Sequence, residues 1–267
     1  MNKIVKGFHE IYQEYDAFIF DLWGVLYEGG PIFPEALNTL KQLHSLKKSV
    51  ILISNSPFLS KDCRANLVEC GLSEELYKEV LTAGDLCMQY LQAHLIEPQK
   101  FYVIDKNYWP AWQTFNPLHT QTENIEEADA ILCLAVPSEV ALPEEVAPYF
   151  DHVFTQAINR GLKLICANPD LFAFCSQKMR LRPGLLSLRY QQLGGEVLSF
   201  GKPFPAIFEQ GLKILGYPKR VLMTGDTEYT DIQGAARHNI DTLLITQRNK
   251  DTPLRSQATY FMEQVKW

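Results

Sequence analysis

Short apolar runs alternate with amphipathic stretches along almost the whole chain. The runs are rich in β-branched and aromatic residues, and each ends where polar residues or glycine begin; they lie at 17–20, 49–53, 100–104, 130–135, 163–167, 220–224 and 241–245. The stretches between them are typical of helices, at about 34–46, 59–70, 84–95, 142–160, 185–193, 204–215 and 229–238. Strands that alternate with helices are joined by crossover connections, which place them parallel in one sheet. The sequence therefore predicts an α/β protein with a parallel sheet.

The composition and charge narrow the partners that this chain can have. With 267 residues, 46% hydrophobic and 21% charged, it is long enough for one large domain or two unequal ones. The formal net charge of -6 argues against a nucleic-acid partner, which usually requires a basic face. The first residues contain no apolar stretch like that of a signal peptide, and no later run approaches a membrane span. We expect no membrane partner and a cytoplasmic location.

Polar side chains follow four of the predicted strands or precede the helices beside them. In an open α/β sheet ligands bind just beyond the carboxyl ends of the strands, so these positions are candidates for a functional site. Asp21 follows the first run. The other three groups are Ser54-Asn55-Ser56 after 49–53, Gly201-Lys202-Pro203 before the helix at 204–215, and Gly225-Asp226-Thr227 after 220–224, with Asp231 five residues beyond Asp226.

Together these residue types suit phosphoryl transfer. Two carboxylates, Asp21 and Asp226, can hold one Mg²⁺, and a carboxylate beside it can attack phosphorus to form an aspartyl-phosphate. Ser54 and the start of the next helix can donate hydrogen bonds to phosphoryl oxygens, while Lys202 neutralises their charge. Each residue alone has a simpler interpretation, as a turn former, a helix cap or a solvated amine. Their order at four strand ends favours the phosphoryl-transfer interpretation.

Four segments carry a resemblance to a known superfamily: FDLWGVLYEG, LISNSP, FGKPFPAIF and MTGDTEYTDIQGA. They resemble the four motifs of the haloacid dehalogenase superfamily, and the flanking segments ICANPDLF and GGEVLSFGKP are similar to its class IIA, NagD-like sugar and nucleotide phosphatases. The resemblance covers nearly the whole chain. It implies a Rossmann-like core, at 1–83 and 184–267, and a C2-type α/β cap domain inserted at 84–183.

The resemblance also implies roles for individual residues. Asp21 would be the nucleophile, Ser54 the phosphoryl-binding hydroxyl and Lys202 the charge stabiliser. Asn55 and Ser56 are expected to bind the substrate, a small phosphorylated metabolite. The implied cofactor is Mg²⁺, with a set of ligands that comprises Asp21, the backbone carbonyl of Trp23, and Asp226, supported by Asp231.

Trp23 departs from the pattern of most phosphatases of this superfamily. The residue two after the nucleophile is usually a second Asp, which protonates the leaving alcohol and then activates water, and an indole cannot do either. A class IIA subgroup is similar in carrying Trp-Gly at this place. Loss of a general acid and base typically costs about 10²–10⁴ in rate, so slow turnover or substrates with good leaving groups are expected.

Three hypotheses are consistent with Trp23. In the first, the chain is an enzyme in which Glu28, a cap residue or the substrate handles the proton, or the leaving group needs none. In the second, it is a module that binds a phosphorylated metabolite without turning it over. In the third, Trp23 packs under the cap and the acids are relics. A dinucleotide-dependent oxidoreductase is disfavoured, because no Gly-x-Gly-x-x-Gly follows any predicted strand.

The predicted cap contributes further candidates. Asn168 and Asp170 follow the run at 163–167, where they can face the substrate or shape a turn, and the turn is the favoured interpretation. Arg182 can bind a second anionic group of the substrate or simply face solvent. The aromatic segment at 107–115 is interpreted as cap core rather than as a lid. A homodimer formed through the cap is a further hypothesis.

Overall fold

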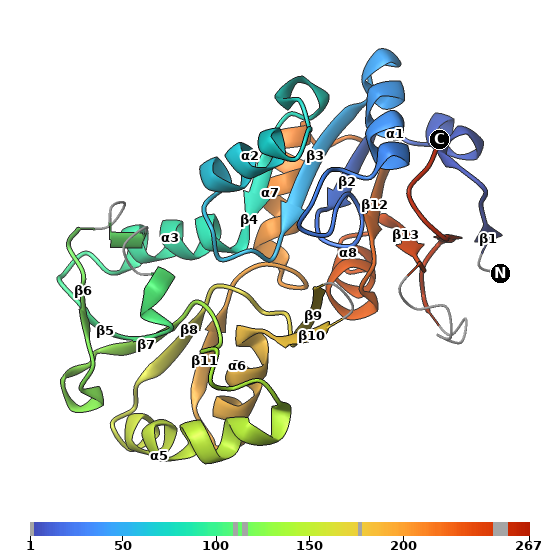
Figure 1. Cartoon of the computed structure of the whole chain (residues 1–267). Coiled ribbons are helices and arrows are strands. Elements are labelled where there is room, and N and C mark those ends of the chain that lie inside the picture. The colour runs from blue at the N-terminus through green and yellow to red at the C-terminus, as the bar shows by residue number, and fades with distance from the viewer. Residues whose placement is uncertain (1–2, 109–111, 114–116, 176–177, 248–255) are drawn as a thin grey trace. The chain divides into compact units, whose positions relative to one another are not determined.

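Residues 3–108, 112–113, 117–175, 178–247 and 256–267 are described by a computed structural model (Figure 1). The chain divides into two units. The first consists of Met1–Ser54, Leu59–Thr82 and Lys202–Trp267, and the second of Asn55–Phe58 and Ala83–Gly201. The second unit thus consists of two segments inserted into the first.

A seven-stranded sheet forms the centre of the first unit. Its order is β1-β14-β13-β12-β2-β3-β4, and all of these neighbours pair in parallel. The chain leaves β2 in one direction toward β3 and β4 and returns on its other side at β12, so the strand order reverses at β2, as in doubly wound sheets. The bounds are Lys3–Ile4 for β1, Ala17–Asp21 for β2, Ser49–Ser54 for β3, Val80–Thr82 for β4, Val221–Gly225 for β12, Asp241–Ile245 for β13 and Tyr260–Met262 for β14.

Helices cover both faces of this sheet. They are α1 (Pro34–Ser45), α2 (Ser60–Glu69), α7 (Pro205–Leu215) and α8 (Gln233–Ala236), and a π-helical turn (Glu228–Ile232) leads into α8. Leu40 of α1 and Leu67 of α2 are buried in one core cluster with Phe18 and Phe20 of β2. On the opposite face α7 approaches closely, since a Cβ atom at Gly211 would lie 2.9 Å from Cδ1 of Ile51. The strand ends are therefore held in a sheet buried on both sides.

The second unit is built on a parallel sheet of its own. The order is β11-β8-β7-β5-β6, and β9 and β10 form a separate antiparallel pair. The strands are β5 (Lys100–Ile104), β6 (Thr120–Thr122), β7 (Ala130–Cys133), β8 (Lys163–Cys166), β9 (Phe172–Cys175), β10 (Lys178–Leu181) and β11 (Glu196–Ser199), and the helices are α3 (Ala83–His94), α5 (Val146–Asn159) and α6 (Pro183–Gln192). Phe154 of α5 and Tyr190 of α6 are buried in the core of this unit, against Leu164 and Cys166 of β8.

The structure confirms the predicted α/β class and parallel sheet, and corrects the predicted domain bounds. Residues 184–201 and Asn55–Phe58, which the sequence placed in the core domain, belong to the second unit. The reason for 184–201 is that β11 pairs with β8 and α6 packs in the same core, so this segment completes the second sheet. The sequence missed the short strands β1, β4, β6, β9, β10, β11 and β14. It also predicted one helix where the chain forms the π-helical turn and α8.

Two further expectations from the sequence can be compared with the structure. Of the aromatic segment at 107–115, residues 109–111 and 114–115 lie outside the described part of the chain, while Trp112 is buried in the second unit with 3% of its surface exposed. Among the described helices, none combines the length and the apolar character that crossing a bilayer requires.

His119 is a buried titratable group in the second unit. Its Nδ1 atom accepts a hydrogen bond from the backbone N–H of Gln99 at 3.2 Å, and its ring packs edge-on against Phe101, with 5.3 Å between ring centroids. Within the described residues its Nε2 atom has no hydrogen-bond partner. Burial lowers the pKa of this imidazole, because a charged ring is poorly solvated there.

The second unit should therefore lose stability in mild acid. The unfolded chain takes up a proton at His119 below about pH 6.5, whereas the folded chain does so only at its lower pKa, so the free energy of unfolding falls as the pH drops from 6.5 toward that value. Urea unfolding at pH 7.5 and 5.5 tests this. His119→Asn, whose side-chain oxygen can accept the same bond from Gln99, should show a smaller pH difference than the wild type, and an equal difference would contradict the assignment.

Candidate active site

Three neighbouring strands place the predicted nucleophile at the centre of the carboxyl edge of the first sheet. Asp21 is the last residue of β2 and pairs in register with Ile53 of β3, one residue before Ser54. On the other side β2 pairs with β12, which is followed directly by Asp226. The apolar character of these strands buries them, and their polar ends meet at one edge. Asp21 is therefore flanked by Ser54 on one side and Asp226 on the other.

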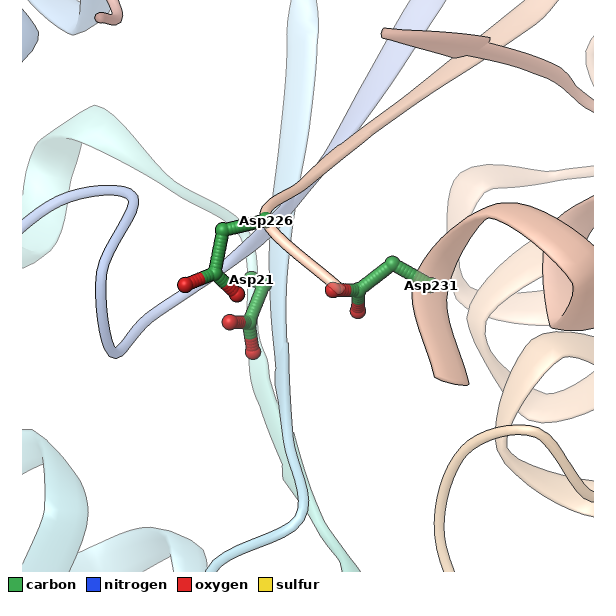
Figure 2. A group of neighbouring side chains, drawn as sticks. All are labelled: Asp21, Asp226 and Asp231. Carbon is green, nitrogen blue, oxygen red and sulfur yellow. The ribbon is translucent and has the colours of Figure 1, made fainter. Parts of the chain in front are cut away.

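Three carboxylates converge at this edge. One oxygen from each of Asp21, Asp226 and Asp231 lies within 4.8 Å of the others, and Figure 2 shows the side chain of Asp231 directed toward the other two. Asp231 comes from the π-helical turn, and its Oδ2 atom accepts a hydrogen bond from the backbone N–H of Thr227 at 3.0 Å. It packs so closely on Gly225 that a Cβ atom there would lie 2.2 Å from the Cβ atom of Asp231. Gly225 is thus required for this packing.

Lys202 joins two of the carboxylates. Its Nζ atom donates hydrogen bonds to Oδ1 of Asp21 at 2.5 Å and to Oδ1 of Asp231 at 2.7 Å. All three side chains are buried: 2% of Lys202, 7% of Asp21 and 1% of Asp231 is exposed. A buried ion pair of this kind needs its partners, since a single buried charge is strongly destabilising. The predicted charge stabiliser and the predicted nucleophile are therefore in direct contact.

The charges of this cluster favour the binding of a further cation. Burial raises the pKa of the Asp21 carboxyl, and the neighbouring Asp231 and Asp226 raise it further, although Lys202 lowers it. One ammonium group thus does not offset the burial of three carboxylates. Hard oxygen donors at this separation are the ligands that Mg²⁺ prefers. The residues present fit a divalent cation, and Asp21, Asp226 and Asp231 are the side chains that would hold it.

Trp23 packs on its own turn. Its half-buried ring lies edge-on to Tyr27, with 5.6 Å between ring centroids, and the backbone N–H of Gly24 donates to the Tyr27 carbonyl at 2.9 Å. Gly29, at a φ of 80°, lies beneath the indole, where a Cβ atom would come within 2.9 Å of the Cη2 atom of Trp23. The indole therefore holds the turn together, and its backbone carbonyl remains a predicted metal ligand.

The side chains of Tyr27 and Glu28, in the same turn, are poorly suited to proton transfer at the site. Burial raises the pKa of the Tyr27 hydroxyl to about 12, so this group holds its proton firmly. Glu28, the replacement acid that the sequence suggested, is exposed. Neither side chain is a buried acid of the kind that the second Asp provides in most phosphatases of the superfamily.

The four predicted substrate-binding residues all lie in the second unit. Asn55 is buried and donates from Nδ2 to Oδ1 of Asp170 at 2.8 Å, while the Ser56 hydroxyl oxygen accepts from the backbone N–H of Phe58 at 3.2 Å. Oδ1 of Asn168 accepts from the backbone N–H of Asp170 at 3.1 Å, and this bond shapes a turn. Arg182 is half-buried and precedes α6. Their contacts with substrate remain predictions.

The contact of Asp170 with Asn55 is one that the sequence did not predict. The sequence indicates that Asp170, like Asn168, is a turn residue, and nothing in the sequence pairs it with Asn55, which lies 115 positions away. Only the three-dimensional arrangement of the second unit brings these two side chains together.

Comparisons with known proteins agree with this geometry. A curated 4-nitrophenylphosphatase from Schizosaccharomyces pombe is 31% identical over 91 residues, a match that spans 33% of this chain and 30% of that protein. A solved haloacid dehalogenase-like hydrolase from Brucella suis 1330 is 25% identical, covers 98% of this chain and 100% of its own, and has a TM-score of 0.85. A solved 4-nitrophenylphosphatase from Thermotoga maritima shares the fold, with 17% identity, 95% and 96% coverage and a TM-score of 0.72.

The family assignment rests on most of the chain. The model of the haloacid dehalogenase-like hydrolases matches residues 15–239, a range that contains Asp21, Lys202 and the other carboxylates of the site. The superfamily predicted from the sequence is therefore confirmed, and its class IIA, NagD-like fold with it. This chain belongs to the haloacid dehalogenase-like hydrolase family.

Proposed function

We propose that this protein is a Mg²⁺-dependent phosphatase that hydrolyses a small phosphorylated metabolite through an aspartyl-phosphate on Asp21. The observation that carries the proposal is the buried contact of Lys202 with Asp21 and Asp231, beside the third carboxylate of Asp226. Two proteins to which the chain is similar bear the name 4-nitrophenylphosphatase, which supports a phosphate ester as substrate.

The chemistry of the first step follows from these positions. A carboxylate oxygen of Asp21 attacks phosphorus, the new O–P bond forms, and the bond from phosphorus to the leaving oxygen breaks. The ammonium group of Lys202 and the hydroxyl of Ser54 stabilise the charge that spreads over the phosphoryl oxygens. Mg²⁺ held by Asp21, Asp226 and the Trp23 carbonyl, with Asp231 in support, would neutralise negative charge at the site. In the second step a water oxygen attacks phosphorus, the new O–P bond forms as the bond between phosphorus and the Asp21 oxygen breaks, the proton of the water passes to solvent, and phosphate leaves with Asp21 restored as a carboxylate.

The Trp23 position favours substrates with good leaving groups. Its side chain cannot protonate a departing alkoxide, so an ester of a strongly basic alcohol would leave slowly. A phenolate or carboxylate departs without prior protonation. Aryl and acyl phosphates are therefore the preferred substrate class.

We also propose that the second unit acts as the C2-type cap that selects the substrate. Asn168 and Arg182 belong to it, and a guanidinium group such as that of Arg182 binds a second anionic group well. Cap insertions exclude water from the reacting groups when they cover a site. The cap then determines which metabolite is accepted, while the first unit carries out the chemistry.

A direct assay tests the phosphatase proposal. Phosphate release is measured from phosphosugars, nucleotides, acyl phosphates and p-nitrophenyl phosphate, with Mg²⁺ and with excess EDTA. We expect release that requires Mg²⁺ and is fastest for aryl or acyl phosphates. No release from any of these substrates in the presence of Mg²⁺ would contradict the proposal.

A metabolite-binding protein without turnover is the second candidate function. The packing of the Trp23 indole on Tyr27 and Gly29 favours it, because this position then has a structural role in place of a catalytic one. This candidate predicts Mg²⁺-dependent thermal stabilisation by a phosphorylated ligand with no release of phosphate. The same substrate panel, examined by thermal unfolding, separates the two functions.

Trp23→Asp should restore the missing proton donor. We expect turnover of an alkyl phosphate such as a phosphosugar to rise by about 10²–10⁴. Turnover of p-nitrophenyl phosphate should rise less, because p-nitrophenolate needs no proton and this substrate gains only from the activation of water in the second step. Parallel kcat measurements on both substrates check this. Trp23→Phe is the matched control, since it shortens the indole without adding an acid, and it should show no gain on either substrate. Equal gains on both would contradict the leaving-group argument.

A further inference from the structure

The loop that follows Ser54 belongs to the second unit and is fixed by hydrogen bonds within it. The backbone N–H of Gly84 donates to the Ser56 carbonyl at 3.0 Å, and Nε1 of Trp112 donates to the Pro57 carbonyl at 3.2 Å. Gly84 comes so close that a Cβ atom there would lie 2.3 Å from the Pro57 oxygen. This loop, residues 55–58, is therefore fixed along its backbone, and its first residue, Asn55, presents a buried side chain.

The loop at residues 168–170 is built in the same way. The backbone N–H of Gly184, in the first turn of α6, donates to the Asp170 carbonyl at 3.0 Å. A Cβ atom at Gly184 would lie 2.2 Å from the Pro169 oxygen, so a glycine is needed here too. Asn168 closes the turn through the backbone N–H of Asp170. With its backbone held at both ends, Asp170 directs its carboxylate to Asn55.

The bond to Asp170 determines how the Asn55 amide is oriented. An ionised carboxylate only accepts hydrogen bonds, so it must face the Nδ2 atom of Asn55, and the Oδ1 atom then faces elsewhere. It faces Gly201, where a Cβ atom would lie 2.5 Å from Oδ1 of Asn55. Gly201 also has a φ of 102°, which few residues other than glycine adopt. Asn55 thus lies between the loop at 168–170 and the backbone at Gly201.

These contacts bear on two residues of the proposed reaction. Asn55 is joined by a peptide bond to Ser54, and Gly201 by a peptide bond to Lys202. A shift of the Asn55 side chain would therefore alter the backbone from which the Ser54 hydroxyl and the Lys202 ammonium group project. Misplacing such groups by about 1 Å can cost on the order of 10² in rate.

We propose that Asp170 is a positioning residue for phosphoryl transfer, which acts by holding Asn55. This proposal rests on the proposed phosphatase function. Asp170 itself takes no part in bond breaking or proton transfer; it orients the amide that links the segments beside Ser54 and Lys202. An oxygen acceptor at position 170, rather than a negative charge, is what the role requires.

The test compares kcat, KM and thermal stability for the whole protein, with p-nitrophenyl phosphate and Mg²⁺. Asp170→Ala should lower kcat by about tenfold or more and change KM little. Asp170→Asn keeps an oxygen that can accept the bond from Asn55, and should retain most of the activity. Asn55→Ala should match Asp170→Ala, and the double variant should be no slower than either, because both remove the same bond.

Asp151→Ala is the matched control for loss of a bonded carboxylate in the same unit. Asp151 accepts a hydrogen bond from Nε of Arg189 at 2.8 Å, on the helices α5 and α6. We expect this variant to lower the melting temperature and leave kcat unchanged. If Asp170→Ala does not fold, Asn55→Ala still removes the bond from its other side.

Three results would overturn the proposal: a melting temperature that falls in Asp170→Ala while kcat stays at the wild-type value, an Asp170→Asn variant as slow as Asp170→Ala, or additive losses in the double variant.

Failure of the phosphatase function is distinguished by the wild type, which would then release no phosphate. In that case the affinities of the wild type and of Asp170→Ala for inorganic phosphate, measured by calorimetry in the presence of Mg²⁺, test the positioning role. A loss of about tenfold in Asp170→Ala supports positioning, and equal affinities or no binding by the wild type overturn it.

Discussion

Asp21→Asn is expected to lower Mg²⁺-dependent phosphate release by on the order of 10³-fold or more. An amide oxygen is a much weaker nucleophile than a carboxylate, and the variant removes one of the three negative charges that would hold Mg²⁺. The fold should persist, because Asn has nearly the same shape and Lys202 keeps its bond to Asp231. Rates of phosphate release from p-nitrophenyl phosphate, compared at equal concentrations of folded protein, measure the effect.

Asp129→Asn is the matched control for this substitution. Oδ2 of Asp129 accepts a hydrogen bond from the backbone N–H of Lys100 at 2.8 Å, and both residues belong to the second unit, whereas the carboxylate cluster belongs to the first. It should leave the rate of release unchanged. An Asp21→Asn variant with more than about a tenth of the wild-type rate would contradict the assignment of Asp21 as the nucleophile, since a tenfold change corresponds to only 1.4 kcal/mol of barrier.

Lys202→Met is expected to abolish turnover and to lower the free energy of unfolding at neutral pH by about 3–5 kcal/mol. Methionine fills the space of the lysine stem, but Asp21 and Asp231 lose the ammonium group that lies 2.5 and 2.7 Å from them. Two buried carboxylates would then repel each other without a counter-charge. Urea unfolding of the wild type and the variant at pH 7.5 gives the difference directly.

The loss in Lys202→Met should depend on pH and on Mg²⁺. Without Lys202, which lowers it, the pKa of the buried Asp21 carboxyl lies still further above that of the unfolded chain, so the folded form binds more protons and its stability falls as the pH rises through this range. The deficit should therefore be smaller at pH 5.5 than at pH 7.5, and Mg²⁺ should restore part of it at pH 7.5. Lys163→Met, which breaks the exposed pair of Lys163 with Glu196, should show little change at either pH. An equal deficit at both pH values would contradict the electrostatic explanation.

The candidate site was predictable where it depends on strand ends. Asp21, Ser54 and Asp226 follow apolar runs, and such runs become buried parallel strands whose carboxyl ends meet at one edge. The same pattern also pointed to Lys202 and Asp231, and the structure places both in one hydrogen-bonded cluster with Asp21. The packing of Trp23 on Gly29 was not predictable, because it depends on the path of the turn.

The sequence by itself determined the α/β class and which residue types stand at the strand ends, because burial on both faces of a sheet requires apolar runs and polar ends lie where these stop. Only the tertiary structure decided the boundary at Gly201–Lys202, since β11 joins the second sheet through pairing with β8. It also decided the contact between Asn55 and Asp170. Periodicity describes neighbours along the chain, whereas pairing between distant segments depends on which arrangement buries the apolar faces and satisfies the polar groups of both.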